Sequence, residues 1–188
     1  MKTSLTLFAA IKPPPHIIRA VEALQKGVEG LRWAPPDNMH ITLGYFGLVD
    51  IEFAEILDHE LASRTKGGAG GGFKLALSSV GVFGSSRPHT LWLGIEKNKD
   101  LLALHTHIRR AARRAHIEME TRKYTPHLSL AYMRGGVSLL DLSHFIKRNL
   151  NFKSKPFLID QFGLYSSNPQ RTGPNIYQRE ASYPLLGR

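Results

Sequence analysis

The chain has 188 residues, of which 42% are apolar and 21% charged, a composition typical of one globular domain. It contains no cysteine, which excludes a disulfide framework, a thiolate zinc site and a cysteine nucleophile. Its net charge of +10 favours a polyanionic partner such as nucleic acid, although an ordinary surface with excess Lys and Arg is the alternative.

The first residues raise the question of a signal peptide, because one lysine precedes a short apolar run. Thr and Ser interrupt this run, and three prolines at 13–15 follow it where a cleavage site would need small residues, so we expect a strand of the mature protein. No stretch approaches the roughly 20 apolar residues of a membrane span. We therefore expect a cytoplasmic protein without a membrane segment, which the absence of cysteine suits.

Strand and helix patterns alternate along the first half of the chain. Short β-rich runs bounded by turn residues indicate strands, and apolar residues at helical spacing indicate helices. The expected elements are a strand at 5–11, a helix at 16–30, a strand at 38–47, a helix at 50–66, a glycine-rich loop at 67–72 and a strand at 73–83.

The second half repeats this order. Its expected elements are a strand at 90–95, a helix at 101–115, a strand at 125–133, a helix at 137–150, a strand at 157–167 and a final edge strand at 175–185. We predict an internal duplication within one bilobal domain, 1–188, with pseudo-repeats of about 1–84 and 85–188. The expected fold is α+β, built from α/β-type repeats related by an approximate two-fold, with antiparallel sheets lining a central cleft and helices outside.

One short motif occurs at the equivalent strand of each half. The first reads His40-Ile-Thr42-Leu and the second reads His127-Leu-Ser129-Leu. Residues two apart in a strand point to the same face, so each histidine shares a face with its hydroxyl residue while the apolar neighbours face the core. An approximate two-fold can then place two imidazoles and two hydroxyls opposite each other across the cleft.

Two facing imidazoles suit a reaction in which one proton is taken and another is given. The pKa of an unperturbed histidine is about 6.5, so one ring can be neutral and the other charged near neutral pH. The hydroxyls of Thr42 and Ser129 can donate to the oxygens of an anionic centre such as a phosphodiester.

Three other interpretations of the motifs remain open. The histidines can be satisfied, half-buried strand residues, or they can bind a metal, although metal sites usually add a third His or a carboxylate and neither motif has one beside it. Thr42 and Ser129 can also be nucleophiles, although neither lies in a Gly-x-Ser-x-Gly turn.

The paired motifs, within this duplicated layout, resemble the 2H phosphoesterase superfamily. The stretches LRWAPPDNMHITLGYFG, VGVFGSSRPHTLWLGI and YTPHLSLAYMR are similar to its 2′-5′ RNA ligase or RNA 2′,3′-cyclic phosphodiesterase branch. The resemblance implies a hydrolase that opens a 2′,3′-cyclic phosphate at an RNA 3′ end to a 2′-phosphate, without metal or cofactor. It also implies that His40 is the proton donor, that His127 is the proton acceptor and that Thr42 and Ser129 hold the phosphate. The resemblance further implies that the same site, run backwards, joins a 5′-hydroxyl to the cyclic phosphate and so forms a 2′-5′ bond.

Weaker substrate-binding candidates flank the motifs: Phe46, Tyr124, Arg87 and Arg134. The expected partner is RNA with a 2′,3′-cyclic phosphate end, with tRNA fragments as one candidate, and we expect a monomer. Two rival functions remain, namely a non-catalytic RNA-binding module and a phosphodiesterase that acts on a small cyclic nucleotide. Salt-sensitive RNA binding without turnover would indicate the first rival, and preference for a cyclic mononucleotide the second.

Overall fold

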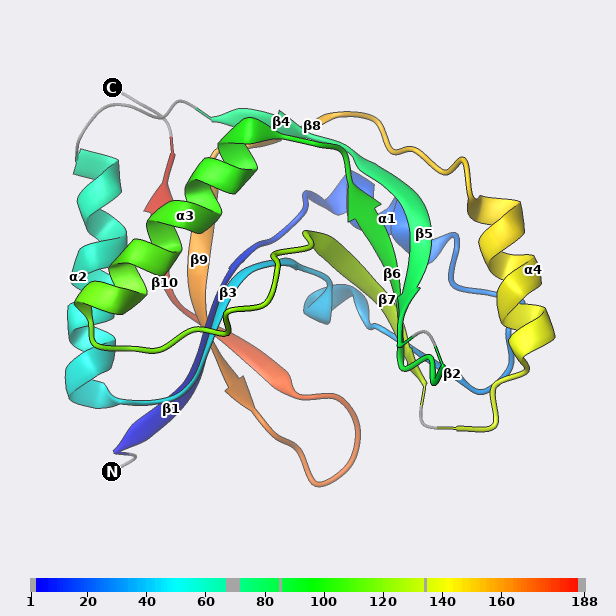
Figure 1. Cartoon of the computed structure of the whole chain (residues 1–188), viewed down its shortest axis with the longest axis horizontal. Coiled ribbons are helices and arrows are strands. Elements are labelled where there is room, and N and C mark those ends of the chain that lie inside the picture. The colour runs from blue at the N-terminus through cyan, green and yellow to red at the C-terminus, as the bar shows by residue number, and fades with distance from the viewer. Residues whose placement is uncertain (1–2, 67–71, 85, 134, 186–188) are drawn as a thin grey trace.

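The computed structural model describes residues 3–66, 72–84, 86–133 and 135–185, and Figure 1 shows how its elements are arranged. Its helices are α1 (Pro15–Glu22), α2 (Ile51–Lys66), α3 (Lys99–Arg114) and α4 (Leu139–Asn149), with a short 3₁₀ turn, η1 (Pro36–Asn38). Its strands are β1 (Ser4–Ile11), β2 (Leu31–Trp33), β3 (Ile41–Asp50), β4 (Phe73–Leu75), β5 (Leu77–Phe83), β6 (Thr90–Ile95), β7 (His127–Met133), β8 (Phe157–Ile159), β9 (Gln161–Asn168) and β10 (Ile176–Pro184).

The larger sheet is antiparallel and has the strand order β10-β9-β1-β3-β7-β6-β5, with β2 added beside β7. The two strands that carry the motifs, β3 and β7, are neighbours at its centre. On one side of this centre β3 is followed by β1 and then β9, and on the other side β7 is followed by β6 and then β5. β1 and β6 are the first strands of the two halves, and β5 and β9 are the last strands that the halves have in common, so the order is symmetric about the junction of β3 with β7. The predicted α+β fold with an approximate two-fold is confirmed by this arrangement.

The halves of the sequence do not each form one lobe. The last strand of the first half, β5, pairs with β6 of the second half, and β9 of the second half pairs with β1 of the first. The strands just before them, β4 and β8, pair with each other in a separate two-stranded sheet. Each lobe therefore combines strands from both halves, and the repeat boundary near residue 84 remains a prediction about the sequence.

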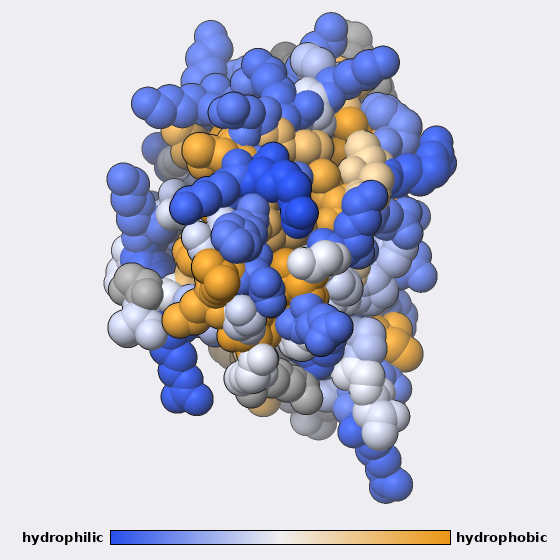
Figure 2. Space-filling model, turned by 90° about the vertical axis from the view of Figure 1, so that its right-hand side faces the viewer, coloured by the Kyte–Doolittle hydropathy of each residue, from blue (hydrophilic) through white to orange (hydrophobic). Residues whose placement is uncertain are grey.

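The helices lie outside the sheet, as expected (Figure 1). α2 and α3 pack together over the β1–β3 side, while α4 covers β5 on the other side. Gly44 of β3 permits the close approach of α3, because an added Cβ would lie 2.9 Å from a methyl group of Ile108. Figure 2 faces the α4 side, where hydrophobic side chains show between hydrophilic ones; Leu139 and Leu140 of α4 are 66% and 65% exposed.

Most expected elements are present, with differences at their ends. The helix expected at 16–30 ends at Glu22, because the chain turns there and Gly27 adopts a φ of +79°, which a right-handed helix does not accommodate. The strands expected at 73–83 and 157–167 are each divided into two. Strand β2 was not predicted, and most of the expected glycine-rich loop, 67–71, lies outside the described residues.

No helix in the described part of the chain is both long enough and apolar enough to cross a membrane.

Candidate active site

The site lies where β3 and β7 meet. Ile41 pairs with Leu128, and both side chains are 0% exposed because they point into the core. In an antiparallel pair the next residues along come opposite each other, so His40 faces Ser129 and Thr42 faces His127 across the strands. Residues directly opposite share one face of a sheet, and the four polar side chains therefore gather on the face away from the core.

Both imidazoles are held in the same way. The Nδ1 of His40 lies 2.7 Å from the backbone oxygen of Asn38, and the Nδ1 of His127 lies 2.8 Å from that of Thr125. A carbonyl oxygen only accepts hydrogen bonds, so Nδ1 carries the hydrogen in each ring. This leaves both Nε2 atoms for a substrate, as an acceptor when the ring is neutral and as a donor when it is charged.

Two aromatic rings pack against the imidazole of His40. Its ring centroid lies 5.0 Å from that of Phe8 and 5.3 Å from that of Tyr177. Burial lowers the pKa of His40 to about 4, against the raising effect of the Asn38 carbonyl, and the positive charges of Lys12 and His127 lower it further. His127 is thus one of the charges that affect the pKa of His40.

The surroundings of His127 are similar in kind. Its ring meets that of Phe83 edge-on at a centroid distance of 4.8 Å, and the indole of Trp92 lies 6.4 Å away. Burial lowers the pKa of His127, the Thr125 carbonyl raises it, and the charge of Arg122 lowers it. Both imidazoles of the free protein are therefore largely neutral at pH 7.

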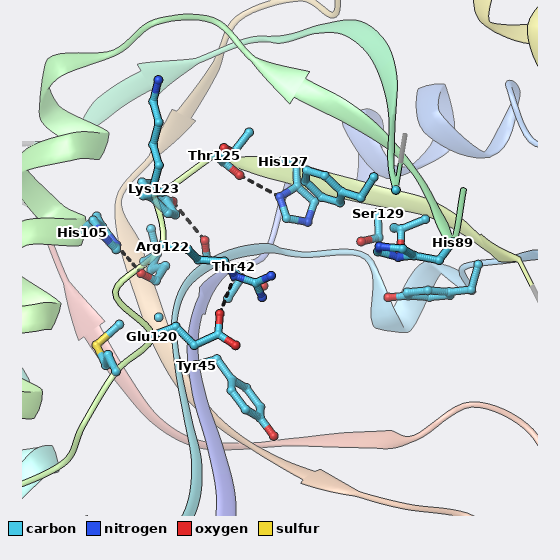
Figure 3. A pocket seen from close by; sticks show the side chains of 18 residues that line it. Thr42, Tyr45, His89, His105, Glu120, Arg122, Lys123, Thr125, His127 and Ser129 are labelled. Atoms are coloured by element: carbon cyan, nitrogen blue, oxygen red, sulfur yellow. Dashed lines mark hydrogen bonds and ion pairs between the residues drawn. The ribbon is translucent and has the colours of Figure 1, made fainter. Parts of the chain in front are cut away.

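A cleft of about 620 Å³ opens on the face that carries His127. Figure 3 shows His127 and Ser129 projecting from one strand, with Thr42 below them. The cleft is lined by Thr42, Leu43, Gly44, Tyr45, Phe83, Gly84, His89, Thr90, His105, Met119, Glu120, Arg122, Lys123, Tyr124, Thr125, His127, Ser129 and Tyr132. Of the two motif imidazoles it receives only that of His127, together with both motif hydroxyls and two cationic side chains.

His40 lines a separate hollow of about 290 Å³. The other residues of this hollow are Phe8, Lys12, Asp37, Tyr165, Tyr177 and Arg179. Because Thr42 lines the cleft and lies only two residues from His40, the two spaces adjoin along β3. The two motif imidazoles thus line adjoining parts of the face that both motifs share, His127 in the larger part and His40 in the smaller.

Phe46 does not line the cleft, contrary to the sequence-based expectation. Its side chain is 5% exposed and packs in the core, whereas Tyr45 is 53% exposed and lines the cleft. The register between β1 and β3 shifts between Ala9 and Ala10, which breaks strict alternation after Thr42. A period of two counted from His40 therefore selects the wrong aromatic residue.

The remaining weak candidates have different outcomes. Tyr124 lines the cleft, but its hydroxyl donates to the backbone oxygen of Thr42 at 3.0 Å, and burial raises its pKa. Arg87 is exposed in the loop between β5 and β6, beside residues that line the cleft but not among them. Arg134 lies outside the described residues.

His105 of α3 belongs to the site, although neither sequence motif includes it. Its ring stacks on Tyr124 at 3.8 Å with an interplanar angle of 5°, and its Nδ1 donates to the backbone oxygen of Leu43 at 2.7 Å. The stacked pair thus holds the carbonyls of Thr42 and Leu43, the last two residues of the first motif. Nothing in the sequence signals this role, because it depends on how α3 packs against β3.

The described residues contain no group of three or more His, Asp or Glu side chains arranged to hold a metal ion.

Comparison with known proteins places the chain in a family. The family model for the 2′-5′ RNA ligase superfamily matches residues 13–171. An RNA 2′,3′-cyclic phosphodiesterase of Thermotoga maritima is 29% identical over 160 residues, covering 84% of this chain and 81% of the relative. One of Methanocaldococcus jannaschii is 26% identical over 178 residues, covering 93% and 97%.

Solved structures agree with the sequence comparison. The crystal structure of E. coli LigT complexed with 3′-AMP matches with a TM-score of 0.78 and 25% identity, covering 97% of this chain and 98% of that one. TT0787 of Thermus thermophilus matches with a TM-score of 0.79 at 18% identity, which supports the fold alone. The family predicted from the two motifs is confirmed, since the matched family model spans most of the sequence: the chain belongs to the 2′-5′ RNA ligase superfamily.

Proposed function

We propose that this protein is a metal-independent RNA 2′,3′-cyclic phosphodiesterase that opens the cyclic phosphate to a 2′-phosphate, with His40 and His127 as proton donor and acceptor. The observation that carries the proposal is the pair of imidazoles on adjoining strands, each with Nδ1 bonded to a backbone carbonyl at 2.7 or 2.8 Å and Nε2 left for substrate. Relatives named RNA 2′,3′-cyclic phosphodiesterase support the same substrate class.

In the proposed reaction, a water oxygen forms a bond to phosphorus while the bond from phosphorus to the 3′-oxygen breaks. His127 accepts the proton of the water through Nε2, and His40 donates a proton from Nε2 to the departing 3′-oxygen. The hydroxyls of Thr42 and Ser129 donate to the non-bridging oxygens and stabilise the charge that builds on them. Each proton transfer is worth about 10² to 10⁴ in rate.

The lowered pKa values set a condition on this scheme. His40 is mostly neutral at pH 7 because burial lowers its pKa to about 4, so it must take up its proton when the anionic phosphate binds. Considered alone, the lowered pKa favours His40 as the neutral base. The donor role therefore follows the family resemblance, and a substrate with sulfur in place of the 3′-bridging oxygen separates the two assignments.

Ligation of a second RNA needs no additional catalytic group. A 5′-hydroxyl in the place of water attacks the cyclic phosphate, His127 accepts its proton, and the 3′-oxygen leaves as before. The product is a 2′-5′ phosphodiester, and the strained cyclic phosphate supplies the free energy. We propose this ligation as a second outcome at the same site.

The test is product analysis with an RNA that ends in a 2′,3′-cyclic phosphate. We expect the wild-type protein to give a 2′-phosphate at a rate that EDTA does not change, and His40→Ala and His127→Ala to lose about 10²- to 10⁴-fold in kcat. His59→Ala, an exposed residue of α2, is the matched control. Full activity in both motif variants, or salt-sensitive RNA binding without turnover, would reject the proposal.

The wider setting of the reaction stays a prediction. We propose a monomer that acts in the cytoplasm on RNA, with tRNA fragments as one substrate. The net charge of +10 supports only the contact with a polyanion such as RNA. Helix α3 exposes Arg109, Arg110 and Arg113, whereas Arg114 pairs with Glu60 at 3.1 Å. Mass measurement in solution and RNA binding at increasing salt test the oligomeric state and the RNA contact.

A further inference from the structure

We infer that Lys12 is a positioning residue of the first motif: it holds the turn whose backbone carbonyl fixes the imidazole of His40 in the form that the reaction needs. The inference rests on the proposed function and deepens it, because it names a residue that acts on the reaction through His40. It does not depend on which histidine is the acid. As an acid or as a base, His40 uses Nε2, so in the neutral ring the hydrogen must lie on Nδ1.

The register of β1 places Lys12 beside His40. Ile11, the last residue of β1, pairs with Ile41 of β3, and both side chains are 0% exposed in the core. In an antiparallel pair the next residue of one strand comes opposite the preceding residue of the other, so Lys12 comes opposite His40. Both side chains therefore lie on the face away from the core, and both line the same hollow.

The ammonium of Lys12 binds the 3₁₀ turn η1, which leads into the first motif. Its Nζ donates to the backbone oxygens of Pro36 and Asp37 at 2.8 and 2.6 Å. The next carbonyl along the chain, that of Asn38, accepts the hydrogen bond from Nδ1 of His40 at 2.7 Å. Because peptide planes are rigid and only two dihedral angles separate neighbouring ones, fixing the first two carbonyls limits where the third can point.

A second contact holds the same turn from the side of β10. The side-chain Nδ2 of Asn38 donates to the backbone oxygen of Asn175 at 2.9 Å, just before β10 begins. The bonds from Lys12 come from a cation, and such charge-assisted bonds are roughly twice as strong as neutral ones. Removal of the ammonium therefore loosens the turn without releasing it, and we expect a partial loss of the His40 orientation.

The equivalent position beside the second motif is a glycine. In the register of β6 with β7, Gly94 lies opposite His127, as Lys12 comes opposite His40. A glycine has no side chain with which to bind the turn before its histidine. The loss of Lys12 should therefore act on His40 and leave His127 unchanged, which makes His127 an internal control in the same molecule.

The neutral state of His40 in the free protein makes the hydrogen bond to the turn decisive. Burial lowers the pKa of His40 to about 4; the bond to Asn38 raises this pKa, and the charges of Lys12 and His127 lower it. The ring is therefore neutral at pH 7, and a neutral imidazole carries its hydrogen on either of its two nitrogens. The carbonyl of Asn38 decides between them, and Lys12 holds the turn that presents this carbonyl.

The test is NMR of the ring nitrogens in the free protein at pH 7, because their chemical shifts report which nitrogen carries the hydrogen. In the wild type we expect the Nδ1–H form at both His40 and His127. Lys12→Met removes the ammonium and keeps most of the side-chain length, so it should shift His40 toward the Nε2–H form and leave His127 unchanged. Lys12→Arg keeps a charged donor and should restore the wild-type form. Lys147→Met, which removes an equal charge from an exposed position on α4, is the matched control.

Turnover of a cyclic-ended RNA supplies a second measurement. Lys12→Met should lower kcat between about 5-fold and 100-fold and change KM less than about threefold, because Nε2 of His40 is then misplaced against the bound phosphate. Lys12→Gln serves in both measurements if Lys12→Met folds poorly.

Two results would overturn the inference. A rise in KM alone would make Lys12 a residue that binds substrate directly. A lower melting temperature with the His40 ring unchanged would show that Lys12 stabilises the fold without orienting the imidazole. The ring measurement needs no substrate, so it decides the inference whether or not RNA is turned over, whereas no turnover by the wild-type protein would reject the proposed function itself.

Discussion

The two motifs have the same local geometry but different surroundings. Each histidine donates from Nδ1 to the carbonyl two residues before it, at 2.7 Å for His40 and 2.8 Å for His127. His40 is packed against Phe8 and Tyr177 beside the charge of Lys12, and its pKa falls to about 4. His127 lines the larger cleft, where a more modest burial and the charge of Arg122 lower its pKa.

This difference shows what a repeated motif can and cannot determine. The pattern sets the face of the strand. The bond from each Nδ1 to the carbonyl two residues before it makes the two rings equivalent as hydrogen-bonding groups. The residues packed around each ring come from other strands and set its pKa. Acid and base can therefore differ between two copies of one motif, as an in-line reaction requires.

The largest effect that tests this comparison is the unequal response of the two histidines to the leaving group. When sulfur replaces the 3′-bridging oxygen, the departing thiolate needs much less help from an acid, since thiols have a pKa of about 8.5. We expect His40→Ala to lose about 10²- to 10⁴-fold in kcat on the oxygen substrate and about tenfold or less on the sulfur one. The measurement is single-turnover cleavage of both substrates.

His127→Ala is the comparison for that experiment. A base is needed whatever group departs, so its loss should be similar on the oxygen and sulfur substrates. The opposite pattern, with His127→Ala rescued and His40→Ala not, would exchange the two roles. Equal rescue of both variants would contradict an asymmetric mechanism altogether.

The second test measures the burial of His40 through protein stability. Its pKa is about 6.5 in the unfolded chain and about 4 in the folded protein, so between these values the unfolded state binds the additional proton. The free energy of unfolding therefore falls as the pH is lowered from 6.5 to 4, by up to about 3 kcal/mol from this residue. His40→Gln, which does not titrate, should flatten this part of the curve in urea unfolding followed across pH.

The same change at His127 completes the series. We expect His127→Gln to remove a smaller part of the pH dependence, because burial lowers the pKa of His127 as well. If His40→Gln and wild type lose stability equally between pH 6.5 and 4, the partial burial of His40 does not lower its pKa in solution.

Local patterns in the sequence predicted much of the fold and the centre of the site. Alternation placed Ile41 in the core and His40 and Thr42 on the opposite face, because the strand is regular at that point. It failed at Phe46, because the shifted register between β1 and β3 depends on how two strands pair and not on either strand alone.

Long-range features were beyond the sequence patterns. Nothing in either half indicates that β5 and β9 pair with strands of the opposite half, because both halves contain the same sequence of elements. Nothing in the helix pattern of α3 marks His105, whose role depends on the packing of Gly44 against Ile108. Sequence periodicity reports which face of an element is buried but not which element covers it.

The smallest expected effect concerns the hydrogen bond that Tyr124 supplies to the first motif but not to the second. Tyr124→Phe removes the hydroxyl that donates to the Thr42 carbonyl at 3.0 Å and keeps the ring that stacks on His105. One such hydrogen bond is worth about 1 kcal/mol, so kcat should fall up to about fivefold as Thr42 loses its fixed position, while KM changes little.

Tyr45→Phe removes a hydroxyl from the same cleft without touching this bond and is the control. If Tyr124→Phe lowers the melting temperature and leaves kcat unchanged, the pair of His105 and Tyr124 stabilises the fold without positioning Thr42 for catalysis, and the first motif needs no more support than the second.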